Sequence, residues 1–178
     1  MKIYIACGLT HVPRDEFPAY VEFLDLLADG LSLETDTEVK YALRHSDPQL
    51  AEKPAIDRAR LCYIWDKDMV EWADVVVAEA SHPSIGLGIE LQLACAKEIP
   101  TILAFKLDDS HRAKPVKYQT PDHRTHDLQL GEGYVSLMAL GLPSIFKVVP
   151  YKDPGQAIAE VSAVVQTLRR PTNDGGSH

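Results

Sequence analysis

The chain has 178 residues, of which 46% are hydrophobic and 25% charged, values typical of one globular domain with a good-sized core. Its formal net charge is −8 and it has no basic block. Duplex binding needs clustered lysine and arginine, so this charge argues against a polymeric nucleic-acid partner, whereas a small anionic ligand needs only a local site.

The three cysteines, Cys7, Cys62 and Cys95, stand in apolar contexts without C-x-x-C spacing. This pattern predicts reduced thiols in the core of a cytoplasmic protein rather than a disulfide framework. The apolar run at the N-terminus is too short for a signal peptide and is typical of a first strand. No stretch reaches the length that crosses a membrane, so we expect no membrane partner.

Apolar runs and turn residues predict strands that alternate with helices. The predicted strands are 2–7, 38–43, 75–79, 100–105 and 146–149. The predicted helices are one from Asp15 or Pro18 to Gly30, then 55–72, 87–97, 132–140 and 154–168. This order predicts right-handed βαβ units around a parallel sheet. The expected fold is therefore α/β, a flavodoxin-like (Rossmann-like) doubly wound five-stranded parallel sheet in a single domain over residues 1–169.

Three segments fall outside this pattern. Residues 44–54 are polar and contain two prolines, which predicts a loop. Residues 107–130 are polar, with two prolines and three histidines, and a segment of this length is typical of a lid, an interface arm or disorder. Residues 170–178 are predicted to be a disordered tail.

The stretch 73–96 carries the most specific pattern in the chain. A buried β-branched strand is followed by a turn, two glycines and a helix that is apolar on nearly every side, which predicts a buried helix. This layout places backbone N–H groups around an anion at a helix N-terminus. Glu90 falls in the predicted first turn, where the helix dipole favours its ionised form. From the residues alone, an acid that merely begins a helix is the alternative.

Residues 73–91 read ADVVVAEASHPSIGLGIEL. They resemble, without a gap, the motif A-D-V-V-V-A-E-x-x-x-P-S-x-G-x-G-x-E-L of the nucleoside 2-deoxyribosyltransferase superfamily. The similarity is greatest to the branch that cleaves nucleoside 5′-monophosphates. It extends over residues 2–30 and 58–106.

Cleavage of an N-glycosidic bond requires a carboxylate at C1′ and stabilisation of the departing base, as in the two-carboxylate chemistry of retaining glycosidases. In the family the glutamate of G-x-G-x-E is the nucleophile, which implies this role for Glu90. The family's catalytic aspartate lies eight residues before the aspartate of A-D-V-V-V, which implies Asp66, with Asp68 as the alternative. A first-strand tyrosine of the family that hydrogen-bonds the nucleophile matches Tyr4.

The resemblance also implies a phosphorylated substrate. Family members that act on free nucleosides carry aspartate at the position of Ser84, whereas the monophosphate-cleaving branch carries serine, whose hydroxyl can donate to a phosphate. The first loop departs from the C-G-S-I-R of that branch, with Leu9 and His11 at two of its positions. The residues expected to bind the substrate and its phosphate are Gly8, Thr10, His11, Ser84, Gly86, Gly88 and Ser136.

Family active sites are completed across a subunit interface, which implies at least a homodimer in which Ser136 reaches the phosphate of the neighbouring chain. The apolar segment 135–140 favours such an interface. The histidines and acids of 107–130 could suggest a metal site, but their spacing matches no known signature. We therefore expect neither metal nor cofactor. The residues weighed for it are His111, Asp122, His123, His126 and Asp127.

The leading hypothesis is hydrolysis of the N-glycosidic bond of a (deoxy)nucleoside 5′-monophosphate to free base and sugar 5-phosphate. One alternative is a nucleoside 2-deoxyribosyltransferase that exchanges bases. A second is a non-catalytic nucleotide-binding or signalling module, with which the fold is compatible. The base and the choice between ribose and 2′-deoxyribose stay open in each case.

Overall fold

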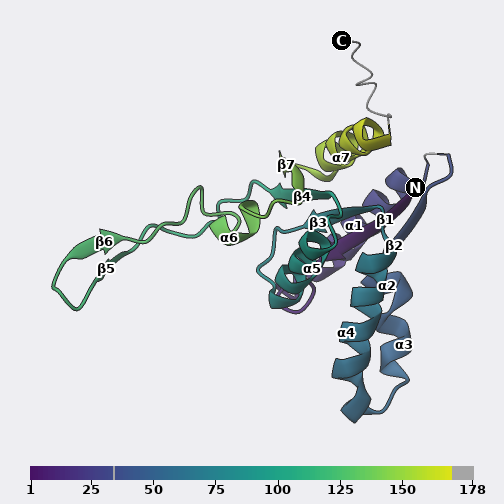
Figure 1. Cartoon of the computed structure of the whole chain (residues 1–178), viewed down its shortest axis with the longest axis horizontal. Coiled ribbons are helices and arrows are strands. Elements are labelled where there is room, and N and C mark those ends of the chain that lie inside the picture. Colours follow the sequence, from purple (N-terminus) through teal and green to yellow (C-terminus); the bar gives the residue numbers. More distant parts are fainter. Residues whose placement is uncertain (34, 170–178) are drawn as a thin grey trace, which may run out of the picture.

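A computed structural model describes residues 1–33 and 35–169, which form a five-stranded parallel sheet flanked by helices (Figure 1). The strand order is β2-β1-β3-β4-β7, the order of flavodoxin-like domains, and it confirms the predicted fold class. The strands are β1 Lys2–Cys7, β2 Glu38–Tyr41, β3 Val75–Glu79, β4 Thr101–Lys106 and β7 Ile145–Tyr151.

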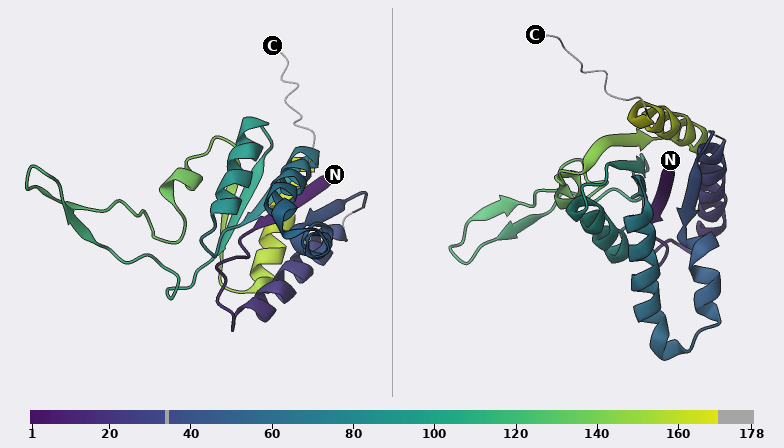
Figure 2. Two further views of the ribbon diagram at one scale, coloured as in Figure 1. Left: turned by 90° about the horizontal axis from the view of Figure 1, so that it is seen from below. Right: turned by 45° about the vertical axis from the view of Figure 1, so that its right-hand side comes forward.

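Side chains that alternate along the strands build a core on each face of the sheet. On one face, Ile3 and Ile5 pack with residues of α1 (Phe17–Ser32) and α7 (Pro154–Arg169). On the other face, Tyr4 packs with residues of α4 (Ala55–Trp72) and α5 (Ile85–Ala96). The two layers of helices are visible in Figure 2.

The strand β3 lies at the centre of the sheet, hydrogen-bonded to β1 and β4, and all five of its residues are buried. Its β-branched run matches the prediction, because a strand buried on both faces needs apolar side chains at every position. The register pairs Cys7 with Glu79, so the ends of β1 and β3 meet at one edge of the sheet. The strand order reverses between these two strands, which is where ligands bind in such folds.

Segment 44–54 differs from the predicted loop. Strand β2 ends at Tyr41, and two short helices follow, α2 (Ala42–His45) and α3 (Asp47–Ala51). The proline at position 48 lies in the first turn of α3, where its missing N–H costs no helical bond. Ile56 is 90% exposed because the first turns of α4 extend beyond the sheet (Figure 1).

Segment 107–130 contains a two-stranded antiparallel hairpin, β5 (Lys117–Gln119) and β6 (Thr125–Asp127), which extends away from the body of the sheet (Figures 1 and 2). The predicted helix over 132–140 is only the four-residue α6, Leu137–Leu140. The predicted tail lies outside the described residues. Among those described, no helix combines the length and the apolar character needed to cross a membrane.

Candidate active site

A cavity of about 510 Å³ lies at the carboxyl ends of the neighbouring strands β1 and β3. Its walls come from β1, the loop after it, helices α2 to α4, and the start of α5. It collects most of the predicted site residues, namely Tyr4, Thr10, His11, Asp66, Ser84, Gly86 and Glu90. Gly88 and Ser136 line a neighbouring groove instead.

Glu90 is only 7% exposed, and the Tyr4 hydroxyl donates a hydrogen bond to its Oε1. The prediction that it lies in the first turn, kept ionised by the helix dipole, is wrong. Helix α5 begins at Ile85, two residues before the predicted start, so Glu90 lies beyond the first turn. The pKa of Glu90 is raised to about 8. Burial is the largest cause; the hydrogen bond from Tyr4 lowers the pKa, and the negative charge of Asp66 raises it.

Tyr4 remains a hydrogen-bond donor because ionising it is costly. Burial raises its pKa well above the usual value, and the negative charges of Glu90 and Asp66 act in the same direction. Tyr4 is 1% exposed on β1, which lies between β2 and β3 in the sheet. The phenol is therefore a fixed donor that holds one carboxylate oxygen of Glu90 in place.

Asp66 projects from α4 into the same cavity. Ser46 Oγ donates to its Oδ1 at 3.2 Å and Cys62 Sγ donates to its Oδ2 at 3.3 Å. Burial raises the pKa of Asp66, while these two hydrogen bonds lower it. Asp68, the alternative, lies outside the cavity with a 63% exposed side chain that reaches Lys67 at 3.9 Å.

Ser84 caps α5, where its Oγ accepts the Leu87 N–H at 3.2 Å and keeps its own hydroxyl proton to donate. The N–H groups of Ile85 and Gly86 precede the first intrahelical bonds, so this helix end offers donors to an anion. Gly8 lets the loop after β1 approach this turn. A Cβ at Gly8 would lie 2.8 Å from Ser84 Cβ and 3.1 Å from the His82 carbonyl oxygen.

Sequence reasoning missed a buried carboxylate at the end of β3. Glu79 is fully buried and accepts hydrogen bonds from Tyr20 at 2.5 Å, from Tyr151 at 2.8 Å and from the Ser81 hydroxyl. Burial raises its pKa, whereas the bonds from Ser81 and the two tyrosines lower it. The network joins α1, β3 and β7 beneath the loop that carries Ser84. In the sequence, the position of Glu79 at the end of an otherwise apolar strand is the one feature that indicates this buried carboxylate.

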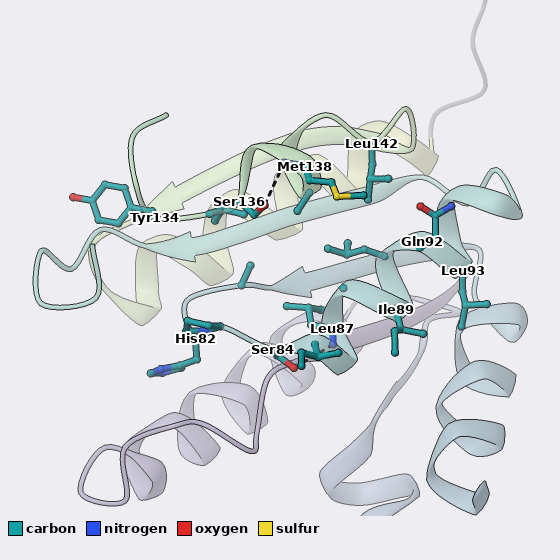
Figure 3. Close-up of a pocket in the computed structure, with 17 residues that line it drawn as sticks. His82, Ser84, Leu87, Ile89, Gln92, Leu93, Tyr134, Ser136, Met138 and Leu142 are labelled. Carbon is teal, nitrogen blue, oxygen red and sulfur yellow. Dashed lines mark hydrogen bonds between the residues drawn. The ribbon is translucent and has the colours of Figure 1, made fainter. Parts of the chain in front are cut away.

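Beside the cavity runs a groove of about 580 Å³ between α5 and α6 (Figure 3). Ser84 and Ser136 line its two sides, and Ser136 Oγ accepts the Met138 N–H at 3.3 Å as the cap of α6. Ile85 is 82% exposed and Met138 83% exposed. Helix α5 is therefore buried on one face only, which corrects the prediction of an entirely buried helix.

The histidines of 107–130 do not form one cluster. His123 lies in the hairpin turn, with a φ of 64°, and His126 lies on β6 with its ring 5.7 Å from that of Tyr118. His111 instead lies beside His82, with ring centroids 4.9 Å apart. Asp122 and Asp127 form ion pairs with Arg124 and Lys117 on the exposed hairpin.

Comparison with known proteins gives a structural likeness only. No family model matches the sequence, and no curated protein does. A conserved protein of Enterococcus faecalis has a TM-score of 0.56 at 19% identity, over 92% of this chain and 98% of that one.

A CMP N-glycosidase of Clostridium botulinum has a TM-score of 0.50 at 14% identity, over 92% of this chain and 99% of that one. A 2-deoxyribosyltransferase of Bacillus psychrosaccharolyticus has a TM-score of 0.45 at 18% identity, over 59% of this chain and 72% of that one. The chain therefore has the α/β fold of the first two solved structures, as the resemblance in sequence predicted.

Proposed function

We propose that this protein hydrolyses the N-glycosidic bond of a (deoxy)nucleoside 5′-monophosphate, releasing free base and sugar 5-phosphate. The observation that carries the proposal is the buried Glu90 carboxyl, held by the Tyr4 hydroxyl in a cavity that also contains Asp66. The C. botulinum structure with the same fold is named a CMP N-glycosidase, which supports this class of reaction.

Glu90 acts as the nucleophile in its ionised form. Its free carboxylate oxygen attacks C1′ of the sugar, the bond to the base breaks, and a glycosyl ester forms on Glu90. Tyr4 holds the other oxygen, which fixes the direction of attack. Water then hydrolyses the ester, frees the sugar phosphate and returns Glu90 to its carboxylate.

Asp66 serves the departing base. Burial raises the pKa of Asp66, and a proton on this carboxyl can pass to the base as the bond to C1′ breaks. In the second step the resulting carboxylate takes a proton from the attacking water. Ser46 and Cys62 hold the two carboxyl oxygens and so set the orientation of the group.

The start of α5 binds the 5′-phosphate. Ser84 supplies a hydroxyl donor, and the amides of the first turn add backbone donors at the positive end of the helix dipole. An aspartate at position 84 would repel this group. Thr10 and His11 face the same cavity from the loop after β1 and complete the binding site.

The chain forms at least a homodimer in this proposal. The groove between α5 and α6 exposes apolar side chains on both sides, and a second copy would cover them. Mixing a Glu90→Ala chain with a Ser136→Ala chain tests whether Ser136 serves its neighbour. Partial return of activity supports a shared site, whereas no return places each site within one chain.

Base release from a panel of ribo- and deoxynucleoside monophosphates, followed by chromatography, tests the function. We expect release from at least one nucleotide and none with Glu90→Ala. Saturable binding without release by the wild type would instead identify a nucleotide-binding module. Addition of a foreign base separates hydrolysis from transfer, because transfer yields a new nucleoside rather than free sugar phosphate.

A further inference from the structure

Three side chains with metal-ligand chemistry meet at the carboxyl edge of the sheet, outside the cavity that holds Glu90. Glu16 directly precedes α1, His82 follows β3, and His111 follows β4. One potential ligand atom from each lies within 4.8 Å of the other two. The residues are far apart in sequence, so the sheet topology alone brings them together.

The two rings are held in place by their surroundings. The ring of Tyr20 packs edge-on against His82, with centroids 4.8 Å apart and an interplanar angle of 83°, and His82 is only 6% exposed. The His111 backbone N–H donates to the Asp108 carbonyl at 3.1 Å. His111 Nε2 lies 3.4 Å from Glu16 Oε1.

A neutral imidazole binds a metal through a ring nitrogen that carries no proton. Among the described residues, Nδ1 of His111 is enclosed and has no hydrogen-bond partner, so a proton on it would lack an acceptor.

We propose that Glu16, His82 and His111 bind one divalent transition-metal ion of the Zn²⁺ type. Two imidazoles and one carboxylate with a fourth position open to water are a ligand set that zinc takes. Ligand atoms at about 2.0–2.1 Å from a tetrahedral ion lie roughly 3.3 Å apart, so binding closes the cluster by about 1.5 Å. The Glu16 side chain, 44% exposed, is free to make that movement.

The ion would join three segments of the chain at this edge of the sheet. It would fix the start of α1 to the loop that carries Ser84 and to the base of segment 107–130. Its role is to stabilise this edge of the folded chain, because binding to the native state raises the free energy of unfolding. It lies outside the Glu90 cavity, so its test is independent of base release.

The test is calorimetric titration of the chelator-treated chain with Zn²⁺, with thermal unfolding in parallel. We expect one equivalent of Zn²⁺ and a higher Tm. Glu16→Gln and His111→Asn should each weaken binding at least tenfold and remove the rise in Tm. Co²⁺ in place of Zn²⁺ should give the visible absorption of a four-coordinate site in the wild type, but not in Glu16→Gln or His111→Asn.

His126→Asn is the matched control, since it removes a histidine of the exposed hairpin, and it should bind as the wild type does. Circular dichroism checks that each variant is folded. No saturable binding by the wild type, or wild-type affinity in both Glu16→Gln and His111→Asn, would overturn the proposal. So would loss of binding in His126→Asn.

Discussion

Replacing Glu90 with glutamine should stabilise the protein while abolishing base release. The unfolded carboxyl ionises near 4.5, and burial raises the pKa in the folded chain to about 8. Folding therefore favours the protonated group, and the stability this gives is lost as the pH rises from about 4.5 to about 8. At 1.36 kcal/mol per pKa unit, the free energy of unfolding falls by roughly 5 kcal/mol over this range. Glutamine does not ionise, so Glu90→Gln does not lose this stability.

Urea unfolding at pH 5, 7 and 9 measures this effect. The free energy of unfolding of Glu90→Gln should exceed that of the wild type by an amount that grows with pH and levels off above about pH 8. The control is Glu22→Gln, at an exposed position of α1, where surface substitutions change stability by under about 0.5 kcal/mol. A difference between Glu90→Gln and wild type that stays constant from pH 5 to pH 9 would refute a buried, proton-binding Glu90.

The remaining predictions concern catalysis. Base release by the wild type should rise with pH through about 8, because roughly one Glu90 in ten is ionised at pH 7; a rate independent of pH from 6 to 9 argues against this nucleophile. Tyr4→Phe should move that midpoint to higher pH and slow release at pH 7 by about 10–100-fold, because the hydrogen bond from Tyr4 lowers the pKa of Glu90 and its loss raises that pKa. Asp66→Asn should cost roughly 10²–10⁴-fold in kcat and Asp68→Asn little, and equal losses in steady-state assays would reject the choice of Asp66. Ser84→Asp should weaken nucleotide turnover at least tenfold through repulsion of the 5′-phosphate, with free nucleosides as the control substrate.

The fold followed from local patterns, whereas much of the site did not. The run Val75–Val77 and its flanking turns predict β3, because a strand buried on both faces leaves a continuous apolar signal. The Glu79 network has no such signal, since Tyr20 and Tyr151 reach it from 59 and 72 residues away. The raised pKa of Glu90 also escaped prediction, because it depends on burial rather than on position along the helix.

The role of Glu90 itself rested on a resemblance, and the structure adds the geometry. The N-cap of α5 is Ser84 rather than one of the glycines after it. The helix therefore starts earlier than predicted, and Glu90 lies beyond the first turn on the buried face. The cluster of Glu16, His82 and His111 was hidden for a similar reason. Its members belong to three loops that meet only when β1, β3 and β4 pair in register.

The most direct test of the central claim is mass spectrometry of the peptide that contains Glu90. The wild-type chain is mixed with a nucleoside 5′-monophosphate whose base it releases, and the reaction is stopped by rapid acid quench. The account predicts that the mass of a sugar phosphate is added to this peptide on Glu90, and that Glu90→Gln shows neither the added mass nor base release. Base release at the wild-type rate by Glu90→Gln, or an adduct on another residue, would contradict it.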